Sequence, residues 1–370
     1  MKAKRILHFP GSIHSGGVGS VVMNLYRNID RTIVNFDFCV NAEGRYPVYD
    51  EIEQLGGKVY QIPQIRQVGI ISFIKYLIRF LKKEGPFDAV HIHSVHMGCV
   101  VLLAAKLAGI DNRIYHVHNS KDAALDSMPF HTIVEFILKI IINLLATKKY
   151  ACGIKAGRYV YMKSKFEVIN NALDLSKFKP CKVESYNLLG SLYTESSIIV
   201  GNVARFVKEK NQQYLISLAK YDKEHDNKLI FMLVGDGPLL IDFKKLVESA
   251  NCEDKFILTG ARGDTWDLYN CMDLFILPSL FEGLPVTLLE AQASGLPCLV
   301  SNCVTREADV HATKISYFGL ENNIEDVVSQ IYELSCYRTY DNDSIKKAFL
   351  SANYEIKSVA NYLQKYYQKL

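Results

Sequence analysis

The sequence predicts an α/β protein of two domains, and two observations support this fold class. The chain has 370 residues and 49% hydrophobic content, which is more than one typical core accommodates. Short apolar runs alternate with longer amphipathic stretches in both halves of the chain, as in proteins built from βα units. The polar stretch from Lys177 to Ser197 has no clear pattern and is the predicted linker.

Ten buried strands are expected, each a short apolar run bounded by turn residues or by an amphipathic stretch. Helices are predicted at Ile70–Lys83, where the apolar positions follow a helical period, and at Ser351–Tyr367. The expected strands are Ile6–Phe9, Asn35–Val40, Lys58–Ile62, Ala89–His93, Arg113–His118, Ile198–Val203, Leu229–Val234, Lys255–Leu258, Leu274–Leu277 and Pro297–Ser301.

Composition excludes several classes of protein. The nine cysteines form no C-x-x-C pair, so we interpret them as buried apolar side chains in a reducing compartment, neither a disulfide framework nor a zinc site. The start of the chain lacks the pattern of a secretory signal. The longest apolar region, residues 130–147, is interrupted by His131, Glu135, Lys139 and Asn143 and is not predicted to span a membrane. We expect a cytoplasmic protein.

Charge is divided unevenly along the chain. Residues 1–180 contain 24 Lys and Arg against 14 Asp and Glu, whereas residues 181–370 contain 19 against 25. The basic half suggests an anionic partner, a membrane surface or a nucleic acid, although ordinary surface variation explains the asymmetry equally well. The helix at 70–83 carries Lys75, Arg79, Lys82 and Lys83 beside apolar residues. Such a stripe can lie on an anionic membrane as a peripheral contact, and a solvated outer helix face explains it at least as well. No nucleic-acid partner is expected.

A glycine-rich loop follows the first strand. Gly11, Gly16, Gly17 and Gly19 precede a stretch that becomes helical near Val21, so the backbone there could approach a phosphate closely. The spacing is neither the dinucleotide fingerprint nor a P-loop.

Histidines occur in pairs two residues apart, which places each pair on one face of its strand. These pairs are His91 with His93 and His116 with His118. With His96 they could form a metal cluster, but no carboxylate is spaced to complete one, and we expect no metal. His118, at the end of its strand, is the candidate site residue. His91 and His116 are better explained as hydrogen-bonded core residues.

Two further motifs are typical of a nucleotide-sugar site. Arg205 and Lys210 flank a loop just past a strand, where they could converge on one diphosphate. Glu282 lies in a turn after the strand at 274–277, and Glu290 lies eight residues on, in a helix. Amides of the first helical turn between these two carboxylates suit a phosphate group. The alternative is that all four side chains are merely solvated.

Together these motifs resemble the retaining glycosyltransferases of family 4, because they occur in that family's order along the chain. The resemblance implies the GT-B fold, in which two Rossmann-like domains face each other across a cleft. It implies an acceptor domain at 1–178, onto which a helix at about 351–370 crosses back, and a nucleotide-sugar donor domain at 179–350. It also implies retaining, metal-independent transfer from a nucleotide sugar, with UDP favoured, to a saccharide or lipid-linked saccharide in exopolysaccharide or capsule synthesis.

The resemblance assigns a role to each candidate residue. His118 would face the donor sugar, Arg205 and Lys210 would bind its phosphates, Glu282 would accept from its hydroxyls, and Glu290 would hold the ribose. The remaining donor contacts would come from backbone and turn positions and from one arginine beside the nucleotide base. These are Gly16, Gly17, Gly235, Arg262, Gly283, Leu284, Val286 and Thr287. No cofactor is implied.

One departure from the family pattern concerns the turn after Glu282. Many relatives have Ser-Phe-Gly there, whereas this chain has Gly283, Leu284 and Pro285. Because Pro285 has no N–H, the amide donors must be those of Leu284, Val286 or Thr287.

The sequence shows no second carboxylate placed to act as the nucleophile of a double displacement. We therefore favour a same-face route, in which no covalent intermediate forms on the enzyme. Two other functions remain open. One is a nucleotide-sugar epimerase of the same fold, and the other is a non-catalytic binding partner in an assembly complex.

Overall fold

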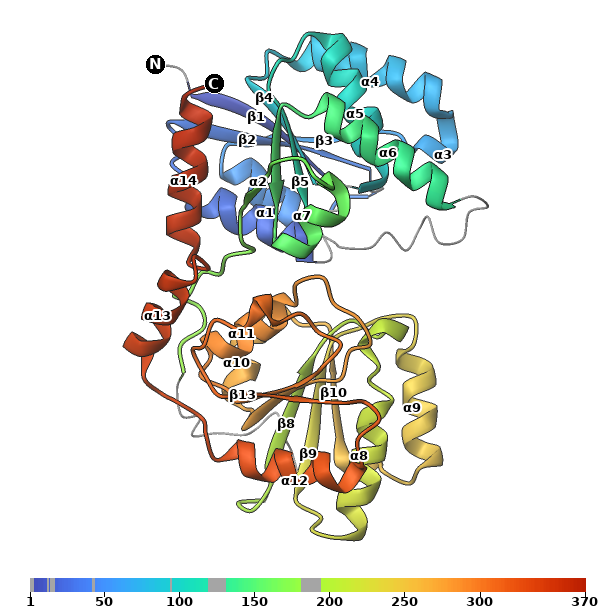
Figure 1. Ribbon diagram of the computed structural model, residues 1–370, viewed down its shortest axis with the longest axis vertical. Coiled ribbons are helices and arrows are strands. Elements are labelled where there is room, and N and C mark those ends of the chain that lie inside the picture. Colours follow the sequence, from blue (N-terminus) through green and yellow to red (C-terminus); the bar gives the residue numbers. More distant parts are fainter. Residues whose placement is uncertain are drawn as a thin grey trace. The chain divides into compact units, whose positions relative to one another are not determined.

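The computed structural model describes residues 3–11, 13, 17–41, 44–93, 95–118, 131–180 and 194–370. The chain forms two compact units: unit 1, residues 1–173 with 353–370, and unit 2, residues 174–352. Each has one parallel sheet flanked by helices (Figure 1). Both are Rossmann-like, which confirms the predicted fold class.

Unit 1 is built on a seven-stranded sheet of order β3-β2-β1-β4-β5-β6-β7. Its central strands β1, β2, β4 and β5 are buried at most positions because helices cover both faces of the sheet. The strands are β1 Lys4–Gly11, β2 Val34–Val40, β3 Val59–Gln61, β4 Ala89–Ile92, β5 Arg113–Val117, β6 Lys148–Ala151 and β7 Glu167–Val168.

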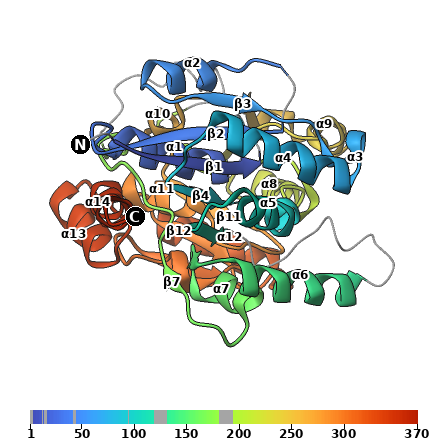
Figure 2. The same ribbon diagram turned by 90° about the horizontal axis from the view of Figure 1, so that it is seen from above.

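The helices of unit 1 form two layers. α1 and α14 pack together against β1 and β2, while α4, α5 and α6 lie side by side on the other face (Figures 1 and 2). The helices are α1 Gly17–Asn28, α2 Pro47–Gln54, α3 Ile65–Val68, α4 Ile70–Glu84, α5 Val95–Ala108, α6 His131–Leu145, α7 Ile154–Tyr161 and α14 Ile356–Gln368. No helix within the described ranges is long and apolar enough to cross a bilayer.

The C-terminal helix belongs to unit 1. The predicted helix at 351–367 is interrupted, since Asn353 has φ +58° and α14 begins only after Glu355, whose side chain accepts from the Lys357 and Ser358 amides at 3.1 and 2.9 Å. Leu363 and Tyr367 are fully buried in the core of unit 1.

Unit 2 is built on a six-stranded sheet of order β10-β9-β8-β11-β12-β13. The strands are β8 Ile198–Val203, β9 Leu229–Val234, β10 Phe256–Gly260, β11 Leu274–Leu277, β12 Cys298–Ser301 and β13 Ile315–Phe318. The helices are α8 Tyr214–Glu224, α9 Leu240–Ser249, α10 Thr265–Asn270, α11 Val286–Ala293, α12 Ile324–Ser335 and α13 Asn342–Ser351, with short 3-10 turns η2 Lys208–Lys210, η3 Glu253–Lys255 and η4 Arg306–Ala308.

Each sheet order has one point where the direction of winding reverses. In unit 1 this point lies between β1 and β4, and in unit 2 between β8 and β11. Loops leaving the carboxyl ends of such neighbouring strands diverge to opposite faces and leave room for a ligand. Of the predicted site residues, Gly16 and Gly17 follow β1, Arg205 and Lys210 follow β8, and Glu282 follows β11. His118, Gly235 and Arg262 follow β5, β9 and β10.

Candidate active site

In unit 2, hydrogen bonds join the loops that follow β8 and β11. The Leu280 amide donates to the Glu209 carbonyl at 2.8 Å, and Asn211 Nδ2 donates to the Pro278 carbonyl at 3.1 Å. Because the two strands are neighbours, these bonds fix the relative positions of the predicted cations and of Glu282. The predicted phosphate loop and the predicted sugar loop therefore form one surface.

Lys210 and Glu282 meet on this surface in an ion pair between Nζ and Oε1. The Ser279 hydroxyl donates to the same carboxylate oxygen at 2.9 Å. Glu282 is 8% exposed and Ser279 is fully buried, so the carboxylate is held in position by one cation and one hydroxyl. A carboxylate that accepts from hydroxyls thus lies in contact with a cation that can bind phosphate, as the sugar–phosphate junction of a donor requires.

Arg205 lies at the start of the same loop with an exposed side chain. Its carbonyl accepts from Gln212 Nε2 at 3.0 Å, and Gln212 is itself buried. The loop backbone is thereby anchored while the guanidinium remains accessible to an anion.

Glu290 is half-buried on α11, and the Tyr269 hydroxyl donates to its Oε2 at 2.9 Å. Desolvation by the surrounding protein raises the pKa of Glu290 to about 7, and the hydrogen bond from Tyr269 opposes this shift. Glu290 therefore changes its charge in the physiological range, where an ordinary exposed glutamate is fully ionised.

The turn between the two glutamates ends where α11 begins, at Val286 after Pro285. The Leu288 amide donates to the Pro285 carbonyl at 3.2 Å and closes a tight first turn. The amides that precede it in this turn belong to Val286 and Thr287. Gly283 and Leu284 lie in the bend between Glu282 and the helix.

The remaining predicted residues of unit 2 already have structural roles. A side chain on Gly235 would lie 2.0 Å from the Ala204 carbonyl oxygen, and its φ is +147°, so glycine is required where the loop after β9 crosses the end of β8. Arg262, after β10, is paired with Asp264 through Nε at 2.8 Å and Nη2 at 2.5 Å. Contact with a nucleotide base would require Arg262 to leave this pair.

The glycine loop of unit 1 is described only in part. Gly16 lies outside the described residues, and Gly17 is the exposed first residue of α1 with open space where a Cβ would be. A Cβ on Gly19 would lie 2.7 Å from the Ile13 carbonyl oxygen. Packing therefore requires glycine at position 19, while accessible space surrounds position 17.

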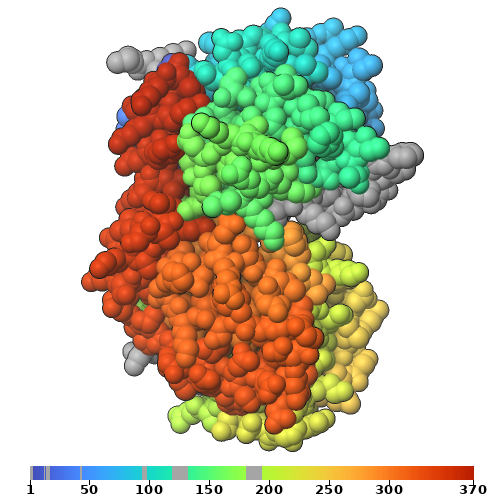
Figure 3. Space-filling view, viewed as in Figure 1, coloured from blue at the N-terminus to red at the C-terminus, as the bar shows by residue number. Residues whose placement is uncertain are grey.

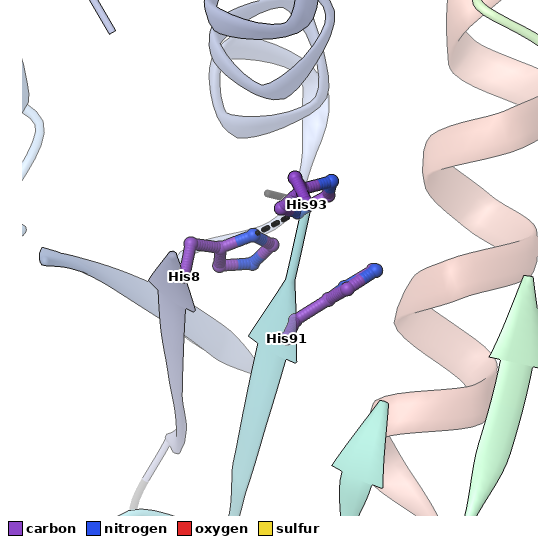
Figure 4. A group of neighbouring side chains, drawn as sticks. All are labelled: His8, His91 and His93. Atoms are coloured by element: carbon purple, nitrogen blue, oxygen red, sulfur yellow. Dashed lines mark hydrogen bonds between the residues drawn. The ribbon is translucent and has the colours of Figure 1, made fainter. Parts of the chain in front are cut away.

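The histidines of unit 1 form a buried stack with one member that the sequence analysis did not identify. His8 on β1 pairs in register with His91 on β4, and Figure 4 shows His8 and His93 joined by a hydrogen bond with His91 beside them. His116 and His118 continue the stack at β5, with ring centroids 4.2 Å apart. All five are at most 5% exposed.

The hydrogen bonds along this stack all have the same direction of donation, from His8 through His93 and His118 to Asn171. Asn171 Oδ1 lies 3.2 Å from His118 Nδ1, and an amide oxygen can only accept, so His118 donates there. A neutral ring then accepts at Nε2, which lies 2.9 Å from His93 Nδ1. By the same rule His93 Nε2 accepts from His8 Nδ1 at 3.0 Å. Both ring nitrogens of His118 are therefore engaged within the protein, and direct contact with a sugar would require breaking one of these bonds.

Within the described ranges, two groups of three histidines could hold a metal ion, because one ring nitrogen of each lies within 4.8 Å of the others. The groups are His8, His91 and His93, and His93, His116 and His118. His93 uses both ring nitrogens in the chain of hydrogen bonds, so an ion would have to displace at least one bond. The side chain of His96 lies outside the part of the chain that the structure describes. The absence of a metal remains a prediction.

The sequence analysis missed four residues that position the candidate groups: Ser279, Tyr269, Asn171 and His8. Ser279 precedes Glu282 by three residues in the same turn, a spacing that could have indicated it. Tyr269 reaches Glu290 from 21 residues away, and Asn171 reaches His118 from 53 away. Those contacts depend on strand order, which the sequence pattern does not contain.

Comparisons with known proteins agree with this architecture. Residues 15–177 match the family model described as glycosyltransferase family 4, and residues 191–349 match glycosyl transferases group 1. EpsF of Bacillus subtilis (strain 168), named as a glycosyltransferase, is 32% identical over 359 residues, which cover 95% of this chain and 93% of EpsF.

Two further similarities extend over most of the chain. The UDP-Gal:alpha-D-GlcNAc-diphosphoundecaprenol alpha-1,3-galactosyltransferase of Escherichia coli is 30% identical over 282 residues, 72% of each chain. The crystal structure of Anabaena Alr3699/HepE in complex with UDP and glucose has a TM-score of 0.78 and 15% identity, covering 99% of both chains. The chain is therefore a glycosyltransferase of family 4 with the GT-B fold.

Proposed function

We propose that the protein transfers a sugar, with retention of anomeric configuration, from a UDP-sugar to a lipid-linked saccharide during surface polysaccharide synthesis. The observation that carries this proposal is the contact between Lys210 and Glu282 at the winding reversal of unit 2. Names of similar proteins support the substrates: UDP is bound in the HepE structure, and the Escherichia coli relative transfers galactose to a diphosphoundecaprenol-linked sugar. A nucleotide-sugar epimerase is not favoured by these relatives.

The chemistry follows from charge. When the bond between the anomeric carbon and the diphosphate breaks, negative charge develops on the leaving oxygen. Arg205, Lys210 and the first amides of α11 would stabilise that charge. The acceptor oxygen would attack from the face that the diphosphate leaves, and its proton would pass to the departing phosphate. No metal or other cofactor enters this scheme.

Transfer is therefore expected to persist in the presence of a chelator, because protein cations and amides neutralise the diphosphate. The measurement is the initial rate with EDTA, compared with the rate after added Mg²⁺ or Mn²⁺. Loss of activity with EDTA and recovery with either ion would contradict the proposed phosphate site.

Glu290→Gln is expected to raise KM for the donor several-fold with little change in kcat, because the ribose does not change during reaction. The wild-type KM should also rise as pH falls through about 7, since protonation replaces an acceptor of ribose hydroxyls with a donor. The variant should lose this pH dependence. Initial rates between pH 6 and 8 would measure both effects. A variant that retains the wild-type pH profile would remove Glu290 from the ribose site.

Glu282→Gln provides the matched comparison, since it makes the same isosteric change on the neighbouring loop. Glu282 is assigned to hydroxyls of the sugar ring, which shifts as the bond breaks, so kcat should fall more than KM rises. UDP, which carries the ribose but lacks the sugar, should bind the Glu282 variant like wild type and the Glu290 variant more weakly. Identical behaviour of the two variants would contradict the division of roles.

A lipid-linked acceptor would bring the enzyme to an anionic membrane surface as a peripheral protein. The four basic residues of α4 predicted to contact it, Lys75, Arg79, Lys82 and Lys83, are all exposed. Their contribution is tested below.

A further inference from the structure

The solvent face of α6 carries a row of large apolar side chains, here called the apolar ridge. Its members are 38–76% exposed and occupy positions i, i+3, i+4, i+7 and i+11 of the helix. They are Ile133, Phe136, Ile137, Ile140 and Leu144. The opposite side of α6 packs on α5, with Ile142 buried. A helix that is apolar on both faces indicates that the outer face also has a partner.

An open pocket of about 940 Å³ begins where α6 ends, between β6, α7 and β7. Its basic lining residues, here called the basic pocket, are Lys148, Lys149, Arg158, Lys163 and Lys165. Glu167, the one acidic residue in the lining, is paired with Lys148. Residues 131–168 contain seven Lys and Arg against two Glu. The ridge is therefore continued by a strongly positive surface.

We propose that the apolar ridge and the basic pocket form the surface on which the protein docks on an anionic membrane. This proposal rests on the proposed function, because a lipid-linked acceptor requires the enzyme to work at a bilayer. In this arrangement α6 lies in the plane of the membrane with the ridge in the acyl boundary, and the pocket takes phosphodiester headgroups. Figure 3 shows the green segment containing α6 and α7 on the visible face of unit 1.

Charge complementarity favours a bilayer over a second copy of this chain. Two copies meeting through this surface would bring the two positive pockets together, whereas anionic lipids neutralise them. The α4 stripe offers a weaker membrane surface. Its charges are exposed, and so are three apolar side chains, those of Ile70, Ile71 and Tyr76. Phe73, Leu77 and Leu81 are buried in the protein, so α4 exposes fewer large apolar side chains than the five of the apolar ridge.

The test is flotation of the full chain with phosphatidylcholine vesicles that contain or lack phosphatidylglycerol. The ridge variant Phe136→Ser, Ile140→Ser, Leu144→Ser and the pocket variant Arg158→Gln, Lys163→Gln, Lys165→Gln should each reduce partitioning onto anionic vesicles by at least about tenfold. All six positions are exposed, so thermal unfolding should be unchanged. The pocket variant keeps the ridge intact and tests the charge independently.

Two control variants make the same kinds of substitution on other surfaces. Lys75→Gln, Arg79→Gln, Lys82→Gln removes the same charge from α4, and Ile241→Ser, Leu246→Ser removes exposed apolar side chains from α9 of unit 2. Both controls should float like wild type. Calorimetry measures UDP binding by the same variants. It shows whether a variant that no longer binds vesicles still has an intact donor site.

Three results with the variants would overturn the proposal. They are wild-type flotation of the ridge or pocket variant, loss of flotation in the α4 control instead, and conversion of a dimer to a monomer by the ridge variant with flotation unchanged. The last result would make a second copy the partner. Failure to bind vesicles together with normal UDP binding would overturn the docking surface and leave the proposed function in place. Vesicle binding without UDP binding would overturn the proposed function and leave the docking surface in place.

Discussion

Replacing Lys210 with alanine is expected to lower kcat for sugar transfer by about 100- to 1,000-fold, equivalent to about 2.7–4 kcal/mol of transition-state stabilisation. In the proposed mechanism Lys210 supplies positive charge where the leaving diphosphate develops negative charge, and its Nζ contacts Glu282 in the structure. Removing it leaves the buried Glu282 carboxylate without its cation, and the Ser279 hydroxyl then holds it alone on that side. The position of the sugar contact would also be weakened.

Lys208 provides a matched control for this prediction. It lies in the same 3-10 turn, two residues before Lys210, with an exposed side chain. Lys208→Ala therefore changes the net charge equally and should retain wild-type kcat. Thermal unfolding of both variants checks that the turn remains folded. Equal rates in the two variants would place the phosphate site elsewhere.

Unit 1 is expected to lose stability steeply as pH falls from 7 to 5.5, because its five stacked histidines cannot accept protons while buried. Burial is the main cause that lowers the pKa of His8 to about 3 and that of His118 to about 4. Burial and neighbouring histidines also hold the pKa values of His91, His93 and His116 well below the usual 6.5. In the unfolded chain each histidine titrates near 6.5, so at pH 5.5 the unfolded state binds more protons.

A histidine whose folded pKa is lowered contributes full stability above the unfolded pKa and loses it as pH falls toward the folded value. At pH 5.5, one unit below the unfolded pKa, the loss is about 1 kcal/mol for each histidine that stays neutral in the folded state, and several kcal/mol for the five together. That is comparable with the whole stability of a typical domain, about 5–15 kcal/mol.

Amide hydrogen exchange at pH 7 and 5.5, corrected for the intrinsic pH dependence of exchange, measures this loss separately in each unit. Unit 2 is the internal control, because its His225 and His311 are exposed. The raised pKa of Glu290 makes protonation favour the folded state of unit 2 as pH falls, so unit 2 should lose no stability between pH 7 and 5.5. His116→Leu should reduce the pH dependence of unit 1. Equal loss of protection in both units would contradict the assignment to the stack.

The sequence predicted those parts of the fold in which apolar runs are long enough to define buried strands. β8, β9 and β11 have the predicted bounds, and the other predicted strands differ by one or two residues at one or both ends. Three strands were missed, and each lacks such a run. β6 reads Lys-Lys-Tyr-Ala, β7 has two exposed residues, and β13 is largely half-buried near the sheet edge. Their strand conformation comes from pairing with neighbours.

The candidate site was predictable as a set of residues but not as a set of contacts. Lys210 and Glu282 are 72 residues apart, and their ion pair exists because β8 and β11 are neighbours in the sheet. His8 was missed for a similar reason. A single histidine in an apolar strand carries no signal until β1 is placed beside β4, where it pairs with His91.

The most direct test of the donor site is amide hydrogen exchange of the full chain with and without UDP in the presence of EDTA. We predict that UDP slows exchange in two segments of unit 2, residues 204–212 after β8 and residues 279–290 through the start of α11. Residues 300–320, around β12 and β13, should be unchanged. Protection confined to other segments, or no protection by UDP, would contradict the claim that these two loops bind the donor diphosphate.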